Sequence, residues 1–355
     1  MRLCPAAKCG RDTITAMNET IPAGTINLAE AELGAQALWA TDDFFAPRER
    51  MLARPEPVSR PGVFDDNGQW MDGWESRRRR GGGHDACIVK LALPGVVQHV
   101  DLDTRFFTGN YPPHASIEAT NDPQPLSDTA SWQPLLAKSA LQGNGHNVFA
   151  VENDQPWQFL RLNIYPDGGI ARFRVWGRVR PDWLRVSPDE VIDLFALHHG
   201  GVGLCANDEH YGSIRNLNRP GCGVNMGDGW ETRRRREPGN DWAVLELGHP
   251  GTIEEVEVDT AHFRGNFPDR VSLQAALLDE KRRHGGLAAS PAFVASLAFA
   301  SEKWTTLLPE QKMRADAQHR FRAELAKLGP VSHVRLNLYP DGGVSRLRLY
   351  GRIAR

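Results

Sequence analysis

One nine-residue segment of the sequence, Asp-Gly-Trp-Glu-Ser-Arg-Arg-Arg-Arg at 72–80, combines acids, an aromatic ring and four consecutive cations. In an extended chain Arg77 and Arg79 share one face, and the other two arginines share the opposite face. One pair can neutralise carboxylates such as Asp72 or Glu75 while the other faces a ligand. A guanidinium suits a planar carboxylate or urea carbonyl because it offers two parallel donors. The segment therefore predicts anion binding, and a solvated edge strand is the competing interpretation.

Two polar pairs flank this segment. His84 and Asp85 are candidates for proton transfer, because a neighbouring carboxylate can bring the pKa of a histidine close to neutrality. Asp42 and Asp43 form the other pair, and turn formation is its simplest interpretation. All four are plausible ligands of a divalent metal. No HxH or HExxH spacing supports such a site, so metal binding stays an alternative and no cofactor is assigned.

The acid and arginine segment belongs to a repeat that spans the chain. It returns at 228–236 with Thr in place of Ser, and Arg-Leu-Asn-Ile-Tyr-Pro-Asp-Gly-Gly at 161–169 returns at 335–343 with one Ile-to-Leu change. The repeat predicts two copies of one domain. We predict a flexible tail over 1–22, a first domain over 23–186 and a second domain over 187–355.

The copies are rich in patterns typical of short strands. Apolar residues alternate with Arg172 and Arg174, which is the period of a half-buried strand. Pro-Asp-Gly-Gly predicts a tight hairpin turn between two such runs. Many short strands predict an all-β fold of two tandem jelly-roll β-sandwiches. One helix is expected in the second copy, over 309–328, because a proline begins it and a Gly-Pro stop follows it.

Composition excludes several classes of protein. The formal net charge of −2 gives no overall field that favours nucleic acid or an anionic membrane. No apolar run approaches the length of a membrane span, and the first residues contain no apolar core of a secretory signal. The five cysteines are odd in number and lack CxxC spacing, which predicts reduced thiols in the cytoplasm rather than disulfides or structural zinc.

The sequence resembles the allantoicase family over residues 27 to 355. The resemblance implies a duplicated jelly roll of the galactose-binding-like kind. It also implies a hydrolase that converts allantoate to ureidoglycolate and urea in purine (ureide) degradation, as a homo-oligomer. The segments that carry it are Leu-Trp-Ala-Thr-Asp-Asp-Phe-Phe-Ala-Pro at 38–47, both acid and arginine segments, Gly-His-Asp at 83–85, Leu-Gln-Gly-Asn-Gly-His-Asn at 141–147 and both Tyr-Pro-Asp-Gly-Gly segments.

The candidate residues fit the substrate that the resemblance implies. Allantoate carries one carboxylate, which Arg77 and Arg79 are predicted to bind, and two ureido groups that need acceptors. Acid and base are also needed, and we predict Glu75 and His84 for these tasks, with Asp85 orienting His84. Further substrate-binding candidates are Asp42, Asp43, Asp72 and Asn110.

The copies differ where protons could move. The second copy has Asn240 in place of His84, and an amide cannot exchange a proton near neutral pH. We therefore assign proton transfer to the first copy. Two alternatives stay open: another ureide amidohydrolase, acting on allantoin or ureidoglycolate, and a non-enzymatic pair of carbohydrate-binding sandwiches.

Overall fold

A computed structural model describes residues 24–278, Ser296 and 303–355, so the tail predicted over 1–22 lies outside the described residues. The chain folds into two compact units. One holds Ile26–Arg185 with His198–Gly200, and the other includes Val186–Leu197 and Gly201–Arg355. No helix of the described part is long and apolar enough to cross a membrane.

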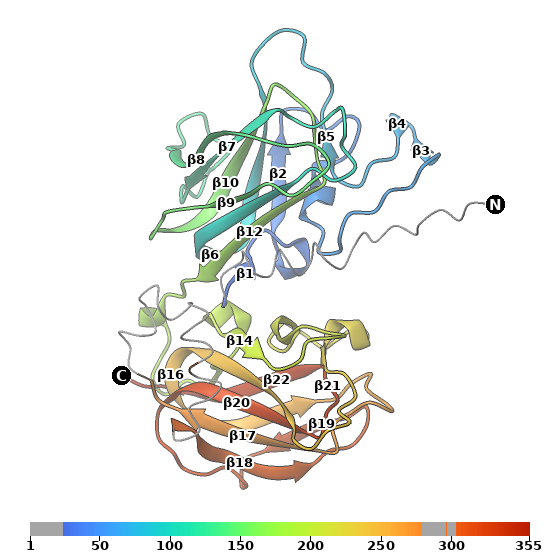
Figure 1. Ribbon diagram of the computed structural model, residues 1–355. Coiled ribbons are helices and arrows are strands. Elements are labelled where there is room, and N and C mark those ends of the chain that lie inside the picture. Colours follow the sequence, from blue (N-terminus) through green and yellow to red (C-terminus); the bar gives the residue numbers. More distant parts are fainter. Residues whose placement is uncertain (1–23, 279–295, 297–302) are drawn as a thin grey trace, which may run out of the picture. The chain divides into compact units, whose positions relative to one another are not determined.

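Each unit is an all-β domain built on one eight-stranded sheet (Figure 1). In the first domain the strand order is β1-β12-β6-β10-β7-β8, and β2 and β9 also pair with β6. The strands are β1 (Ile26–Asn27), β2 (Gln36–Ala40), β6 (Asp85–Asp103), β7 (His114–Thr120), β8 (Gln133–Ala140), β9 (Val148–Ala150), β10 (Pro156–Tyr165) and β12 (Arg172–Val179). The 3-10 helices are η1 (Ala31–Leu33), η2 (Arg48–Leu52) and η3 (Trp183–Arg185).

The second domain repeats this order as β13-β22-β16-β20-β17-β18, with β14 and β19 on β16. Its strands are β13 (Ile192–Asp193), β14 (Val202–Ala206), β16 (Asp241–Asp259), β17 (Arg270–Ala276), β18 (Thr305–Lys312), β19 (Gln318–Phe321), β20 (Val331–Tyr339) and β22 (Arg346–Ile353). Its 3-10 helices are η5 (Ile214–Asn216) and η6 (Met226–Asp228), and η4 (Leu197–His199) is divided between the two units. The all-β fold of two sandwich domains is confirmed.

The long strand β6 joins the two layers of the first sandwich. Its first half pairs with β2 and β10, and its second half pairs with β9 and β12. The register slips between Lys90 and Gly95, around Pro94, where a proline cannot donate to a ladder. Gly95 is required there because an added Cβ would lie 2.8 Å from the carbonyl oxygen of Arg178. The core between the layers consists of the alternate apolar side chains of these strands.

Short strand pairs close one end of each sandwich. In the first domain β5 (Trp74–Glu75) pairs with β11 (Gly169–Ile170), and in the second β15 (Trp230–Glu231) pairs with β21 (Gly343–Val344). These pairs bring the acid and arginine segment next to the Pro-Asp-Gly-Gly turn. The first domain also has a small hairpin, β3 (Phe64–Asp65) with β4 (Gly68–Gln69).

The hairpin predicted at Pro-Asp-Gly-Gly is wrong. β10 and β12 do not pair with each other but lie on either side of β6, so the turn crosses from one layer to the other. The crossing is tight, because an added Cβ at Gly169 would lie 2.0 Å from the ring of Phe107. The turn is stabilised by contacts far away in sequence, which its own residues do not reveal.

The helix predicted over 309–328 is also wrong. This segment forms the end of β18, which pairs with β17, and β19, which pairs with β16. Met313, His319 and Phe321 are buried there. The turn between the two strands interrupts the alternation of buried and exposed residues, so the period of two was not apparent from the sequence. Pairing with the edge of β16 satisfies the hydrogen-bonding groups of the backbone in this segment. Helix propensity depends only on local sequence and does not include such a distant partner.

Candidate active site

Glu75 lies at the end of the first sandwich, half-buried and held from two sides. Its backbone pairs with Gly169 and with Ala46. Asn110 Nδ2 donates a hydrogen bond of 2.6 Å to Glu75 Oε1. Burial raises the pKa of Glu75, and the hydrogen bond from Asn110 only partly opposes this. A partly buried carboxyl group with a raised pKa can serve as a general acid.

The four arginines separate into two pairs, as an extended chain requires. Arg77 Nε donates to Asp42 Oδ2 at 2.7 Å, and its backbone N–H donates to Asp42 Oδ1 at 2.8 Å. Arg79 donates to Asp85 Oδ1 through Nε and a terminal nitrogen, at 3.1 and 2.6 Å. Arg78 and Arg80 are exposed and have no partner in the described part of the chain. The predicted separation into two pairs is present. However, Arg77 and Arg79, which were predicted to bind the ligand, are the two that pair with carboxylates of the chain.

The carboxylates that hold these arginines differ from the predicted ones. Asp42 and Asp85 take these places, not Asp72 or Glu75. Asp43 pairs with Arg48 at 2.5 Å. Hydrogen bonds from Arg77 lower the pKa of Asp42 although burial acts to raise it. Asp42, Asp43 and Asp85 were considered as metal ligands together with His84. Each of these acids already pairs with a guanidinium group.

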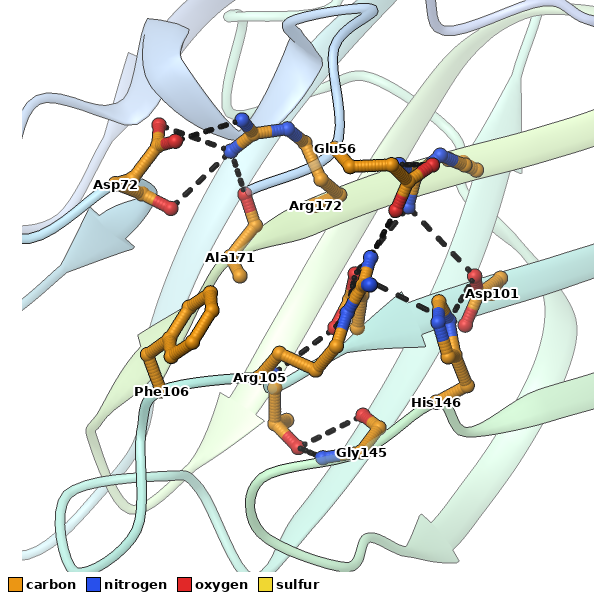
Figure 2. A network of polar contacts seen from close by, with 12 residues as sticks. Glu56, Asp72, Asp101, Arg105, Phe106, Gly145, His146, Ala171 and Arg172 are labelled. Atoms are coloured by element: carbon orange, nitrogen blue, oxygen red, sulfur yellow. Dashed lines mark hydrogen bonds and ion pairs between the residues drawn. The ribbon is translucent and has the colours of Figure 1, made fainter. Parts of the chain in front are cut away.

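Asp72, a predicted substrate ligand, is bound to a buried arginine instead. Arg172 donates to both of its carboxylate oxygens, at 3.1 and 2.9 Å (Figure 2). It also donates to the carbonyl oxygen of Pro55 at 2.8 Å. Only 2% of the Arg172 side chain is exposed. The arginine was expected on the exposed face of its strand, and the loop around Pro55 covers it. Arg172 therefore anchors the loops that lead into Glu75.

His84 and Asp85 do not act as one pair. His84 is exposed, with Nε2 3.3 Å from Asn163 Oδ1 and its ring centroid 4.6 Å from that of Tyr165. Asp85 is buried and accepts from Thr41 Oγ1 at 2.8 Å and from Arg79. No hydrogen bond between His84 and Asp85 is present in the described chain. The side chain within hydrogen-bonding distance of His84 is that of Asn163 and not that of Asp85.

Sequence reasoning missed an ionic cluster in the same domain (Figure 2). Asp101 and Asp103 are fully buried on β6, and His146 Nδ1 lies 2.9 Å from Asp101 Oδ2. Arg105 and Arg174 contact Asp103 and also Glu56, which lies in a loop far away in sequence. The signal available was a pair of acids at alternate positions of one strand, where they share a face.

Three members of the cluster, Glu56, Asp103 and His146, offer ligand atoms within 4.8 Å of one another. Both carboxylates already hold guanidinium groups, from Arg105 and Arg174. The arginines supply the positive charge that a cation would bring. We therefore describe these residues as an ionic cluster whose carboxylates are already paired with arginines, and not as a metal centre.

The family model for the allantoicase repeat matches residues 26–180 and again residues 192–354. The chain belongs to the allantoicase family. A probable allantoicase 2 of Burkholderia pseudomallei is 55% identical over 331 residues, which cover 93% of this chain and 95% of the relative. A probable allantoicase of Ralstonia nicotianae is 55% identical over 329 residues, 92% and 94% of the two chains. The crystal structure of allantoicase from Saccharomyces cerevisiae, 32% identical, superposes with a TM-score of 0.76 and covers 95% of this chain and 97% of its own.

The second allantoicase repeat keeps the contacts that hold Glu75, Arg77, Arg79 and Asp72 in the first. We call this set of contacts the frame. Asn266 Nδ2 donates to Glu231 Oε1, Arg233 Nε donates to Asp208 at 2.7 Å, and Arg235 donates to Asp241 at 2.6 Å. Arg346 holds Asp228 as Arg172 holds Asp72. Each of these contacts has its counterpart in the first repeat. The frame is therefore a property of the repeat and cannot by itself tell the two domains apart.

The partners of the charged cluster differ between the two repeats. In the second repeat, buried acids of β16 are held by Arg320 and Arg322. Asp101 pairs with Val148 and its counterpart Glu257 pairs with Arg320, so Gln318 stands where the first repeat has His146. The histidine of the second repeat corresponds instead to Asn147. Asn147 Nδ2 lies 2.9 Å from the carbonyl oxygen of Leu102, and His319 Nδ1 lies 3.2 Å from that of Val258. His146 and His319 are therefore one residue out of register between the repeats.

Proposed function

We propose that this protein hydrolyses allantoate to ureidoglycolate and urea. The observation that supports the proposal is the match of both repeats to one family, together with 55% identity to relatives named probable allantoicase across nearly their whole length. In the net reaction, the bond from the central carbon of allantoate to one ureido nitrogen breaks, the hydroxyl group of water takes its place on that carbon, and the departing nitrogen takes up a proton to give urea.

Glu75 is the group best suited to supply that proton. Burial raises its pKa, so a larger fraction keeps its proton at a given pH than an exposed glutamic acid would keep. The hydrogen bond from Asn110 fixes one oxygen and leaves the other, Oε2, for a ligand. Asn110 then acts on the substrate through Glu75, although we first expected it to bind the ureido group directly.

His84 is the proposed base. It is exposed, and Asn163 and Tyr165 fix the orientation of its ring. Its neutral form can accept a proton from the attacking water near neutral pH. Asp85 keeps a supporting role, since it holds Arg79 rather than His84.

Arg78 and Arg80 are the proposed carboxylate ligands in place of Arg77 and Arg79. The two paired arginines have already given donors to Asp42 and Asp85. The backbone N–H of Arg79 is also fixed, at 2.8 Å from Asp167 Oδ2. Anchoring on alternate residues holds the segment in place and leaves Arg78 free to form a two-point contact with a carboxylate.

Location and assembly are further proposals. Cys87, Cys205 and Cys222 are free thiols, which suits the cytoplasm. We also propose a homo-oligomer, because closed symmetric assemblies are common among enzymes of this kind.

The test is to incubate the purified protein separately with allantoate, allantoin and ureidoglycolate and to measure urea from each. We expect urea from allantoate and no comparable release from the other two. Urea released from allantoin or ureidoglycolate instead would identify a different ureide hydrolase. Binding without urea release from any of the three would identify a binding module and overturn the proposal.

A further inference from the structure

His84 is held through one of its two ring nitrogens. Its Nε2 lies 3.3 Å from Oδ1 of Asn163, and its Nδ1 has no hydrogen-bond partner in the described part of the chain. Asn163 lies on β10 and is only 3% exposed, whereas His84 is exposed. The histidine ring also lies beside that of Tyr165, with the centroids 4.6 Å apart. The group that Asn163 presents to Nε2 therefore decides which nitrogen carries the hydrogen of the neutral ring.

The amide group of Asn163 is aimed by two acceptors on β7. Its Nδ2 donates to Oε2 of Glu118 at 2.9 Å and to Oγ of Ser116 at 3.2 Å. A carboxylate only accepts hydrogen bonds, so the NH2 group has to face Glu118 and the carbonyl oxygen has to face His84. Arg161 also binds this carboxylate, at 2.7 Å, and holds it in place beside the amide.

The second domain has the same hydrogen bonds with different residues at both ends. The asparagine there is Asn337, whose Nδ2 donates to Ser272 Oγ at 3.2 Å and to Gln274 Oε1 at 3.3 Å. Its Oδ1 accepts from Nδ2 of Asn240 at 3.3 Å. Gln274 is the counterpart of Glu118, because each lies opposite the arginine two residues before the asparagine. The oxygen of the central asparagine thus meets an N–H donor in the second domain too.

The histidine and the carboxylate of the first domain are therefore both replaced by amides in the second. A glutamine can turn its amide group and present donors, so Gln274 leaves the direction of Asn337 reversible. Glu118 has no donor when it is ionised, and it does not allow the reversal. Asn240 needs no such control, because its hydrogens stay on one nitrogen. A neutral imidazole, in contrast, can carry its hydrogen on either nitrogen.

We propose that Asn163 and Glu118 are positioning residues that keep the hydrogen of neutral His84 on Nε2 and leave the lone pair of Nδ1 to accept a proton. Asn163 acts by accepting from Nε2–H, and Glu118 acts through Asn163. The functional part of this inference rests on the proposed role of His84 as the base. In that role Nδ1 takes the proton of the attacking water, whose hydroxyl group goes to the central carbon of the substrate. The hydrogen bond from Nε2 stays in place throughout, so no rearrangement is needed.

Nitrogen NMR measures the tautomer directly and needs no substrate. The full chain is labelled with 15N-histidine, and the His84 signals are assigned by their absence from His84→Asn. In the neutral ring of wild type we expect the hydrogen on Nε2 and none on Nδ1. Asn163→Leu is expected to populate both tautomers, so that the two nitrogen shifts move toward each other. Glu118→Gln, which introduces the residue of the second domain, is expected to give a smaller shift in the same direction.

A hydrogen on Nδ1 of wild type, or the same mixture of tautomers in wild type and Asn163→Leu, would overturn the inference. Near-ultraviolet circular dichroism identifies a variant that does not fold. If Asn163→Leu is such a variant, Ser116→Ala combined with Glu118→Ala replaces it, because this pair removes both acceptors that aim the amide. The double variant is expected to give the same mixture of tautomers, and an unchanged Nε2 tautomer there would also overturn the inference.

Urea release from allantoate tests the functional part. Asn163→Leu is expected to lower kcat roughly tenfold, a fraction of the roughly 10²-fold that a whole general base contributes, and to leave KM nearly unchanged. Asn337→Leu is the matched control, because it removes the same asparagine where no histidine depends on it. It should leave both constants nearly unchanged.

These kinetics also distinguish the inference from the proposed function. An unchanged kcat in Asn163→Leu, together with mixed tautomers, would overturn the positioning role while allantoate hydrolysis stands. A wild type that releases no urea from allantoate would overturn the proposed function and the positioning role together. The tautomer of His84 is decided by NMR in either case.

Discussion

His84 lies against Tyr165 in the first domain, while in the second domain Asn240 occupies that place, 3.3 Å from Asn337. A second difference is in the charged cluster, where Arg105 of the first domain corresponds to Ala261 and His146 to Gln318. Around these positions the frame of glutamate, asparagine and paired arginines is the same. Contacts present in both domains therefore stabilise the shared fold, and chemistry specific to one domain must come from the residues that differ.

The strongest test of this difference compares the two glutamates. Glu75→Gln is expected to lower kcat for urea release by roughly 10³-fold, since the amide cannot supply a proton. The matched variant Glu231→Gln is expected to change it less than threefold, because Asn240 stands in the second domain where the first has His84. Steady-state kinetics with allantoate measure both. A larger loss in Glu231→Gln would assign the reaction to the second domain.

The shared frame is tested through its buried ion pairs. Arg172→Met leaves Asp72 without its guanidinium and is expected to lower the free energy of unfolding by about 3–5 kcal/mol. Arg346→Met should cost a similar amount in the second domain, where Asp228 loses the guanidinium 2.6 Å away and keeps only the more distant one of Arg219 at 3.6 Å. Urea denaturation, followed with a spectroscopic probe in each domain, measures the free energy of unfolding of both variants. A cost confined to one variant would mean that the frame is not equivalent in the two repeats.

His84→Asn converts the first site to the residue of the second. We expect a loss of roughly 10²-fold in kcat, the typical contribution of a general base. Asn240→His serves as the reverse control and should leave kcat within twofold. Unchanged urea release in His84→Asn would remove this residue from the mechanism.

The smallest expected effect concerns the cluster. Burial acts to raise the pKa of Asp103, but hydrogen bonds from Arg105 outweigh it and hold the pKa below its usual value. A lowered folded-state pKa stabilises the protein above the unfolded value of about 4, and this contribution disappears as pH falls through the folded value.

Arg105→Ala, which introduces the residue of the second domain, should therefore lower the free energy of unfolding by about 1.5–3 kcal/mol at pH 7. The difference from wild type should shrink below pH 4, where Asp103 takes up a proton. Urea denaturation between pH 7 and pH 3 follows it. An equal cost at every pH would show that Arg105 contributes packing rather than charge.

Much of the architecture was determined by local pattern. Repetition of the acid and arginine segment predicted two copies of one domain, and alternating apolar residues predicted the strands, because both signals are carried by neighbouring residues. The separation of the arginines into two pairs was also predictable, since alternate side chains of an extended chain point to opposite faces.

Only the tertiary structure determined which side chains distant in sequence contact each other. Asp42 rather than Glu75 holds Arg77, Arg172 is buried by the loop around Pro55, and Asn163 rather than Asp85 contacts His84. Segment 309–328 contains the end of one strand and the whole of another, although its local sequence favours a helix. It forms strands because the edge of β16 lies beside it. The chain's residues determine which groups are present, but the energy of an ion pair or a ladder depends on what the fold places opposite it, and that is a non-local property.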